Sequence, residues 1–193
     1  KAVYLHDYLA DLITYREDTH AHNAYGALAN GVAVCEGYAE AYQVLLREAG
    51  ILSFIATGTS INPGTGMPEN HAWNYVQMDG VFYHVDVTWD DQGEELFHAY
   101  FGLTDEMIQE DHTIGAAGYD LPQCTSDVAF YFKGKSSLLT SYSVSTVAPL
   151  LKTEGEAHVY VTGDTDGFET WYLSQDTILA IAKANGVTGQ IEM

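Results

Sequence analysis

One cysteine lies where a thiol could be activated. Cys35 falls within NGVAVCEGYAEAYQVLLREAG, residues 30–50, where a short apolar run gives way to a helical pattern. A thiol at a helix start faces unpaired backbone N–H groups and the positive end of the helix dipole, and both favour the thiolate. Position alone leaves four roles open for Cys35: a buried small apolar side chain, half of a disulfide with Cys124, a metal ligand, or a nucleophile.

A thiol nucleophile needs a general base and a group that orients that base. The segment HAWNYVQMDGVFYHVDVTWDD alternates aromatic and polar residues on both sides of Asp79–Gly80, which is a strong hairpin signal. With a two-residue turn, His71 and Asp86 are diagonal neighbours on one face, and with a four-residue loop they lie directly opposite. Only a three-residue loop would separate their faces. The hairpin therefore favours an imidazole–carboxylate pair of His71 and Asp86.

Helices must hold this hairpin and the cysteine in place. Apolar residues at helical spacing predict an amphipathic helix over residues 2–16. A second helix is expected to begin at Cys35 and to stop at Gly50. A short capped helix is expected to start at Thr104.

Strands follow the second helix. Residues 51–61 are rich in β-formers and predict a strand, whereas Pro and Gly predict a loop over residues 62–70. Residues 113–136 predict a Gly-rich loop with a strand at VAFYFK. The remaining segments predict helix, strand, helix and strand at SVSTVAPLLKTEG, EAHVYVTG, SQDTILAIAKANG and VTGQIEM. Helices followed by antiparallel strands favour the α+β class.

Composition excludes several classes of partner. The chain has 193 residues, 47% of them apolar, with 7 basic and 27 acidic side chains for a net charge of −20. Such a charge repels nucleic acids and anionic membrane surfaces, so we expect neither as a partner. No apolar run has the ~20 residues of a membrane span, so membrane insertion is not expected.

The start of the chain and its Tyr-rich, Lys-poor composition bear on localisation. The first residue is Lys1 and there are 14 tyrosines, so we expect a longer precursor and an extracellular or cell-surface bacterial protein. The sequence leaves the oligomeric state open.

These motifs together resemble a known family. GVAVCEGYAEAYQVLLREAGI, followed by NHAWNYVQMDGVFYHVDVTWDD, is similar to bacterial transglutaminase-like domains of the papain-like cysteine proteinase superfamily. HDYL, AYGAL and YFGLTDEMI resemble the same set. The resemblance implies an α+β cysteine-proteinase fold, with the nucleophile at the N-terminus of a central helix packed on an antiparallel sheet. It implies Cys35 as nucleophile, His71 as base and Asp86 as the residue that orients the base.

The resemblance covers residues 1–112, which we expect to be the catalytic core of a single domain over 1–193. Residues 113–193 are expected to be an α/β C-terminal elaboration, whose role the sequence leaves open. The implied activity is thiol-dependent acyl transfer or hydrolysis on amide bonds of a protein, peptide or cell-wall peptide, through a thioester. Water and an amine both remain open as acceptors, although the lack of an evident calcium loop favours hydrolysis or another acceptor. The alternative is a catalytically silent peptide- or cell-wall-binding module of the same fold.

Other residues are weaker candidates. An oxyanion hole would use the backbone N–H of Cys35, with Tyr25 as a candidate second donor. Trp73 and Trp89 flank the base and the acid and could exclude water from the thiol, and His84 shares the face of Asp86.

Histidines near the N-terminus raise the question of a metal site. The HAH motif at 20–22 could begin one with His6, His84 or the acidic pair at 90–91. Its spacing matches no known zinc site, so we expect no metal and no cofactor.

Overall fold

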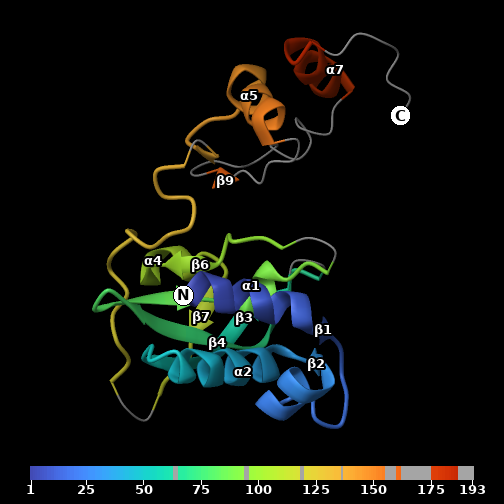
Figure 1. The fold of residues 1–193 in the computed structure, drawn as a ribbon. Coiled ribbons are helices and arrows are strands. Elements are labelled where there is room, and N and C mark those ends of the chain that lie inside the picture. The colour runs from blue at the N-terminus through green and yellow to red at the C-terminus, as the bar shows by residue number, and fades with distance from the viewer. Residues whose placement is uncertain are drawn as a thin grey trace. The chain divides into compact units, whose positions relative to one another are not determined.

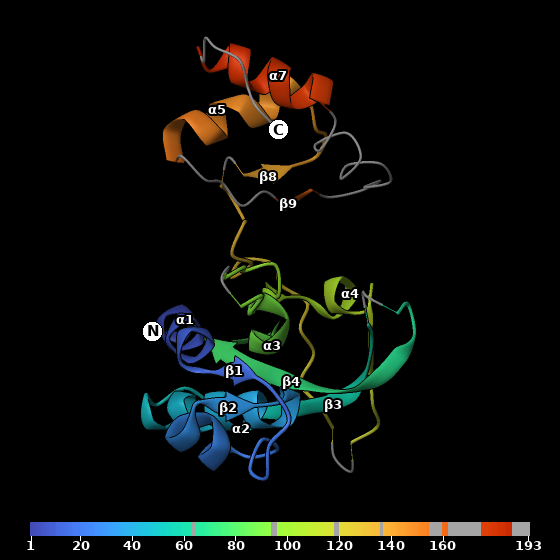
Figure 2. The ribbon, with the colours of Figure 1, turned by 90° about the vertical axis from the view of Figure 1, so that its right-hand side faces the viewer.

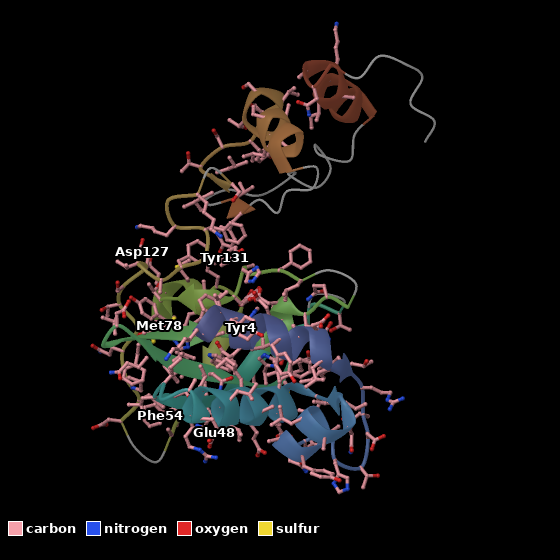
Figure 3. All side chains as sticks on the ribbon, viewed as in Figure 1. Tyr4, Glu48, Phe54, Met78, Asp127 and Tyr131 are labelled. Atoms are coloured by element: carbon pink, nitrogen blue, oxygen red, sulfur yellow. The ribbon has the colours of Figure 1, made fainter. Side chains whose placement is uncertain are left out.

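The predicted hairpin forms with the shortest of the three turns considered. In the computed structural model, β4 (Pro68–Met78) pairs antiparallel with β5 (Val81–Val85), and Met78 lies opposite Val81. Asp79 and Gly80 have positive φ angles of 50° and 84°, as a two-residue type I′ turn requires. Met78 is labelled at this end of β4 in Figure 3. The register therefore brings His71 and Asp86 to one face, as the first alternative predicted.

The structure describes residues 1–62, 65–93, 96–117, 120–135, 137–154, 160–161 and 175–186. The chain divides into two compact units, Lys1–Tyr131 and Phe132–Met193. The sequence placed the end of the core near residue 112 within one domain. The first unit continues to Tyr131 because later backbone returns to it: Asp105 N donates to the Cys124 carbonyl at 2.8 Å, and Tyr131 N donates to the Phe101 carbonyl at 3.1 Å.

The main sheet has the strand order β6-β5-β4-β3-β7, and every neighbouring pair is antiparallel. Its remaining strands are β3 (Ser53–Ile61), β6 (Phe101–Leu103) and β7 (His112–Ile114). β3, β4 and β5 were predicted from the sequence, but β6 and β7 were not. Both missed strands have only three residues, too few for an alternating pattern to be visible. The predicted loop over residues 62–70 is wrong at its end, because Pro68–Asn70 pair with β3 and belong to β4.

Helix α1 (Ala2–Leu12) is shorter than the predicted 2–16. Ile13 adopts extended backbone, and β1 (Thr14–Tyr15) pairs in parallel with β2 (Val32–Ala33). Pairing with a distant segment therefore ends the helix earlier than its apolar spacing suggested.

Helix α2 (Cys35–Glu48) begins at the predicted cysteine and ends before Gly50. It runs along one face of β3 and β4 (Figures 1 and 2), where Asn74 Nδ2 donates to the Ala39 carbonyl at 3.0 Å. The apolar core joins α1, α2 and this face of the sheet. Its largest buried side chains include Leu9, Tyr38, Tyr42, Leu46, Val76 and Val85. A helix that starts at Cys35 and packs on an antiparallel sheet confirms the α+β class.

The described residues of the first unit also form three short helical segments: η1 (Gly26–Asn30), α3 (Val87–Asp90) and α4 (Asp105–Ile108). Thr104 caps α4 by accepting from Met107 N at 3.1 Å, as predicted. The prediction of a strand at VAFYFK is wrong. Those residues form turns, closed by Phe130 N donating to Asp127 O and Lys135 N donating to Phe132 O.

The second unit contains the two predicted helices, α5 (Val144–Glu154) and α7 (Gln175–Ala184). They lie side by side in Figure 2, over a core of Leu139, Val147, Ala148, Leu150 and Ile181. Strands β8 (Leu138–Leu139) and β9 (Tyr160–Val161) pair in parallel. Most of the strand predicted at EAHVYVTG, and all of the one at VTGQIEM, lie outside the described residues. No described helix in either unit has the length and apolarity that a membrane crossing needs.

Candidate active site

Cys35 is the first residue of α2 and is half-buried. The preceding Val34 is extended and its N–H donates to the Ala21 carbonyl at 3.0 Å. Because Cys35 lies at a helix start, its own N–H has no acceptor within the helix. Cys35 and Cys124 are both free thiols, so the disulfide considered from the sequence does not form.

His71 and Asp86 form a direct buried pair. His71 Nε2 lies 2.6 Å from Asp86 Oδ2, and the two residues are 6% and 0% exposed. Asp86 also caps α3, because its Oδ1 accepts from Trp89 N at 3.2 Å. Since Nε2 of His71 is bound to Asp86, Nδ1 is the ring nitrogen left to interact with Cys35, which lines the same hollow as His71.

The charges of this pair follow from its neighbours. Burial opposes a charge on His71, but Asp86 and then Cys35 outweigh burial and raise the pKa of His71 to about 10. Burial also opposes the charge on Asp86, yet the charge of His71 and hydrogen bonds from His112 and His71 hold the pKa of Asp86 below its usual range. The pair is therefore imidazolium and carboxylate at neutral pH.

Two hollows meet at His71. The first, of about 380 Å³, includes Cys35, Glu36, Gly58 and Ala72 in its lining. The second, of about 430 Å³, is lined by Tyr15, Asn62, Glu69, His71, Thr88, Trp89 and Gln92. A substrate lying across both hollows would pass the ring of His71 and the thiol of Cys35.

The tryptophans enclose the base. Trp73 is 1% exposed and stacks on His71 with ring centroids 5.9 Å apart and planes 17° apart. Trp89 also lies 5.9 Å from the His71 ring and lines the second hollow. Both contact the His71 ring, but neither is among the described residues that line the hollow containing Cys35.

His84 belongs to a separate hydrogen-bonded chain. Its Nδ1 accepts from Trp73 Nε1 at 2.9 Å, so its Nε2 carries the proton and donates to Asp105 Oδ1 at 2.9 Å. Burial lowers the pKa of His84, with His112 adding to the effect and Asp105 opposing it. His84 is therefore a neutral imidazole that accepts a hydrogen bond from Trp73. It is linked to His71 only through Trp73, which stacks on the His71 ring.

The structure does not bring Tyr25 to the cysteine in the way the sequence analysis considered. Its side chain is 62% exposed, packs edge-on against His20, and is not among the described residues lining either hollow. Tyr15 lies closer to the site. It lines the second hollow, and burial together with the charge of Cys35 raises its pKa. The β1–β2 pairing that positions Tyr15 had no signal in the local sequence.

His112 was also missed. Its Nε2 lies 3.2 Å from Asp86 Oδ2, so the orienting carboxylate contacts two imidazoles. Its Nδ1 contacts Asp111 Oδ1. The only sequence signal was an acid–histidine dipeptide after a short helix.

Three groups of side chains among the described residues have geometry that could hold a metal ion. They are His6 with Asp7 and His98, His71 with Asp86 and His112, and His84 with Asp105 and Cys124. The HAH motif at 20–22 contributes to none of the three. In each group at least two of the ligand atoms already hydrogen-bond to each other. His84 could bind a metal through Nε2 only by losing the proton that its bond from Trp73 places there.

Comparison with known proteins agrees with the motifs. Residues 1–87 match the family model of the transglutaminase-like superfamily. This part of the chain is thus similar to transglutaminase-like domains, and the α+β fold expected from the resemblance is confirmed. None of the curated protein sequences compared with the chain matches it.

Two similar solved structures are a protein from Cytophaga hutchinsonii, provisionally described as a cysteine protease, and a TGase. The first is 15% identical, with a TM-score of 0.41 over 67% of this chain and 49% of that chain. The second is 15% identical, with a TM-score of 0.40 over 96% of this chain and 43% of that chain. The chain thus spans about half, or less, of the length of these relatives.

Proposed function

We propose that this transglutaminase-like domain attacks amide carbonyl groups with the Cys35 thiol, with His71 as the base and Asp86 as its orienting partner. The observation that supports this most is the position of the His71 ring. One ring nitrogen is bound to the buried Asp86 carboxylate at 2.6 Å. The ring also lines the same hollow as Cys35, whose side chain contributes to raising the pKa of His71. This is the arrangement that a thiol nucleophile requires.

The first half of the reaction follows from this arrangement. Cys35 reacts as the thiolate, with its proton already held at Nδ1 of the His71 imidazolium. The sulfur bonds to the amide carbonyl carbon while the C=O π electrons move to oxygen. The N–H of Cys35 is the first donor to that oxygen. When the C–N bond breaks, His71 returns the proton to the leaving nitrogen, and a thioester remains on Cys35.

The second half needs an acceptor. Water or an amine loses a proton to His71 and attacks the thioester carbon, the C–S bond breaks, and Cys35 leaves as a thiolate. The described linings of the two hollows contain Glu36 and Glu69 but no Lys or Arg. We therefore propose a peptide or protein substrate that is neutral or positively charged near the reacting amide.

A partitioning experiment tests this proposal. The protein is incubated with a glutamine-containing peptide and a labelled primary amine, and mass spectrometry follows free acid, amine conjugate and acylated Cys35. We expect one or both products and a thioester adduct on Cys35, none of which should form in the Cys35→Ala variant. Absence of every product across varied peptides and cell-wall fragments would favour the silent binding module.

Alkylation of the two thiols provides an internal control. Cys35 opens into a hollow, whereas Cys124 is 1% exposed and burial raises its pKa above the usual thiol value. Iodoacetamide near neutral pH should therefore modify Cys35 alone in the folded protein. Equal rates at both cysteines would count against an activated Cys35.

A further inference from the structure

His112 occupies an unusual position beside the site. Its ring is buried, and its two nitrogens face two different carboxylates, Nε2 toward Asp86 at 3.2 Å and Nδ1 toward Asp111. A neutral imidazole has one N–H and one lone pair, so it can donate to only one of the two carboxylates. The geometry is satisfied at both ends when the ring carries both protons.

The surroundings favour this charged form. Burial lowers the pKa of His112, but hydrogen bonds to Asp111 and Asp86 outweigh burial and raise it overall. The other titratable groups around the ring are His71, with its ring centroid 5.3 Å away, Tyr100 at 5.7 Å, and His84, whose pKa it lowers. Tyr100 Oη donates to Asp111 Oδ2 at 2.5 Å, which keeps that carboxylate directed at the ring.

We propose that His112 is a positioning residue for the thiol reaction, a charged imidazole held between Asp86 and Asp111 that fixes the orienting carboxylate and limits how strongly Asp86 stabilises the protonated base. The inference rests on the proposed function for its catalytic consequence, but not for the charge of His112. Asp86 Oδ2 accepts from both rings. The positive charge of His112 therefore offsets part of the negative charge that His71 experiences.

The close pairing of β7 with β3 places His112 beside Asp86. Ser60 of β3 pairs with His112, and Gly58 pairs with Ile114 on one side and with His71 on the other. A Cβ on Gly58 would lie 1.9 Å from the Thr113 carbonyl oxygen, so only glycine lets β7 come this near. The family match ends at residue 87 and so assigns no role to His112.

The protonation state can be measured without turnover. ¹⁵N NMR of the imidazole nitrogens in the Cys35→Ala protein should show both His112 nitrogens protonated at pH about 7.5, well above the ordinary histidine pKa. The Asp111→Asn variant keeps the contact with Asp86 and should lose the second proton. A neutral His112 ring in the parent would overturn the inference. An inactive protein with a doubly protonated His112 would refute the proposed function alone.

The pH profile tests the consequence. Loss of the positive charge in His112→Gln should move the alkaline limb of kcat/KM upward by about one pH unit, because the protonated base becomes more stable. Maximal kcat should fall about tenfold, since Asp86 loses a charged hydrogen bond. Asp111→Asn should move the limb in the same direction by less.

His98→Gln is the matched control, because His98 also contacts a carboxylate, Asp7 at 2.8 Å, but not Asp86. The alkaline limb of the kcat/KM profile should stay in place in the His98→Gln variant. A lower thermal midpoint in His112→Gln with an unshifted limb would mean that the ring only fills space, and this would reject the proposal.

Discussion

One short helix carries two aspartates that differ in what their histidines do. Asp86 caps the start of α3 and Asp90 is its last residue. Each is fully buried and each binds a buried imidazole, His71 to Asp86 at 2.6 Å and His6 to Asp90 at 3.0 Å. Within one turn of helix the chain thus builds two pairs of the same chemistry.

The difference lies at the second nitrogen of each ring. The His71 ring also lines two open hollows, one of which contains Cys35, whereas His6 Nδ1 contacts a further carboxylate, Asp7, at 2.9 Å. Burial raises the pKa of Asp90 to about 6 despite its hydrogen bonds from His6 and Tyr100 N. One nitrogen of His71 is thus left to face a hollow that contains Cys35, whereas both nitrogens of His6 are bound to carboxylates, and the bond to Asp90 joins α1 to α3.

The largest contrast is expected between the two histidines. His71→Gln should reduce kcat/KM by a factor on the order of 10⁴, since the base is lost. His6→Gln should leave kcat within about threefold but lower the free energy of unfolding by roughly 3 kcal/mol, because it breaks a buried pair. Steady-state kinetics and urea unfolding measure both. Similar losses of turnover in two folded variants would remove the distinction between the pairs.

The aspartates should differ in the same sense but less strongly. Asp86→Asn should cost about 10²–10⁴ in kcat, because the amide no longer holds the ring in the required tautomer. Asp90→Asn should mainly reduce stability, by about 1–3 kcal/mol for an altered buried hydrogen bond. A near-normal kcat in a folded Asp86→Asn protein would contradict the orienting role.

The two pairs should also lose stability in different pH ranges. The folded pKa of His71 is raised from 6.5 to about 10, so its contribution is complete below 6.5 and is lost as pH rises toward 10. The folded pKa of Asp90 is raised from 3.8 to about 6, so its contribution is complete below 3.8 and is lost as pH rises to about 6.

Urea unfolding across pH can separate the two contributions. The Cys35→Ala protein is compared with the same protein carrying His71→Gln or Asp90→Asn, so that the thiol of Cys35 does not titrate. We expect each difference in unfolding free energy to shrink in its own range. A His71→Gln difference that is constant with pH would show that the ring is not charged in the folded state.

The smallest effect on activity is expected at Tyr25, which lines neither hollow. Tyr25→Phe should change kcat/KM by less than about twofold, because a surface substitution away from a site rarely matters. Tyr15→Phe, which removes a hydroxyl beside the second hollow, should change it more. A tenfold loss in Tyr25→Phe would restore the oxyanion role considered from the sequence.

The sequence predicted the local parts of the site well. The cysteine at a helix start and the Asp-Gly turn are signals carried by neighbouring residues, and strand parity then brought His71 and Asp86 to one face. β5 ends at Val85, so Asp86 acts as a helix cap rather than a strand residue. The pairing survives because the cap directs Oδ1 to the Trp89 N–H and leaves Oδ2 for the ring.

The non-local parts could not be predicted in this way. His112 reaches Asp86 only through the pairing of β7 with β3, and Tyr15 reaches the hollow only through a two-residue parallel bridge. Neither contact has a periodic pattern in the sequence. The apolar spacing over residues 2–16 predicted a helix through Tyr15, so the β1 strand there was not predicted. Likewise, VAFYFK has strand-forming residues, but turns closed by Asp127 and Phe132 override that propensity.

The two contacts of Asp86 also imply an order of assembly. His71 is 15 residues from Asp86 along the chain and both are tied to the hairpin, whereas His112 is 26 residues away and depends on a strand from the far edge of the sheet. Closing the longer loop has the greater entropic cost and comes later in folding. During refolding, the base should therefore meet its carboxylate before the second imidazole arrives, and reactivity toward thiol reagents should appear before the final pH response.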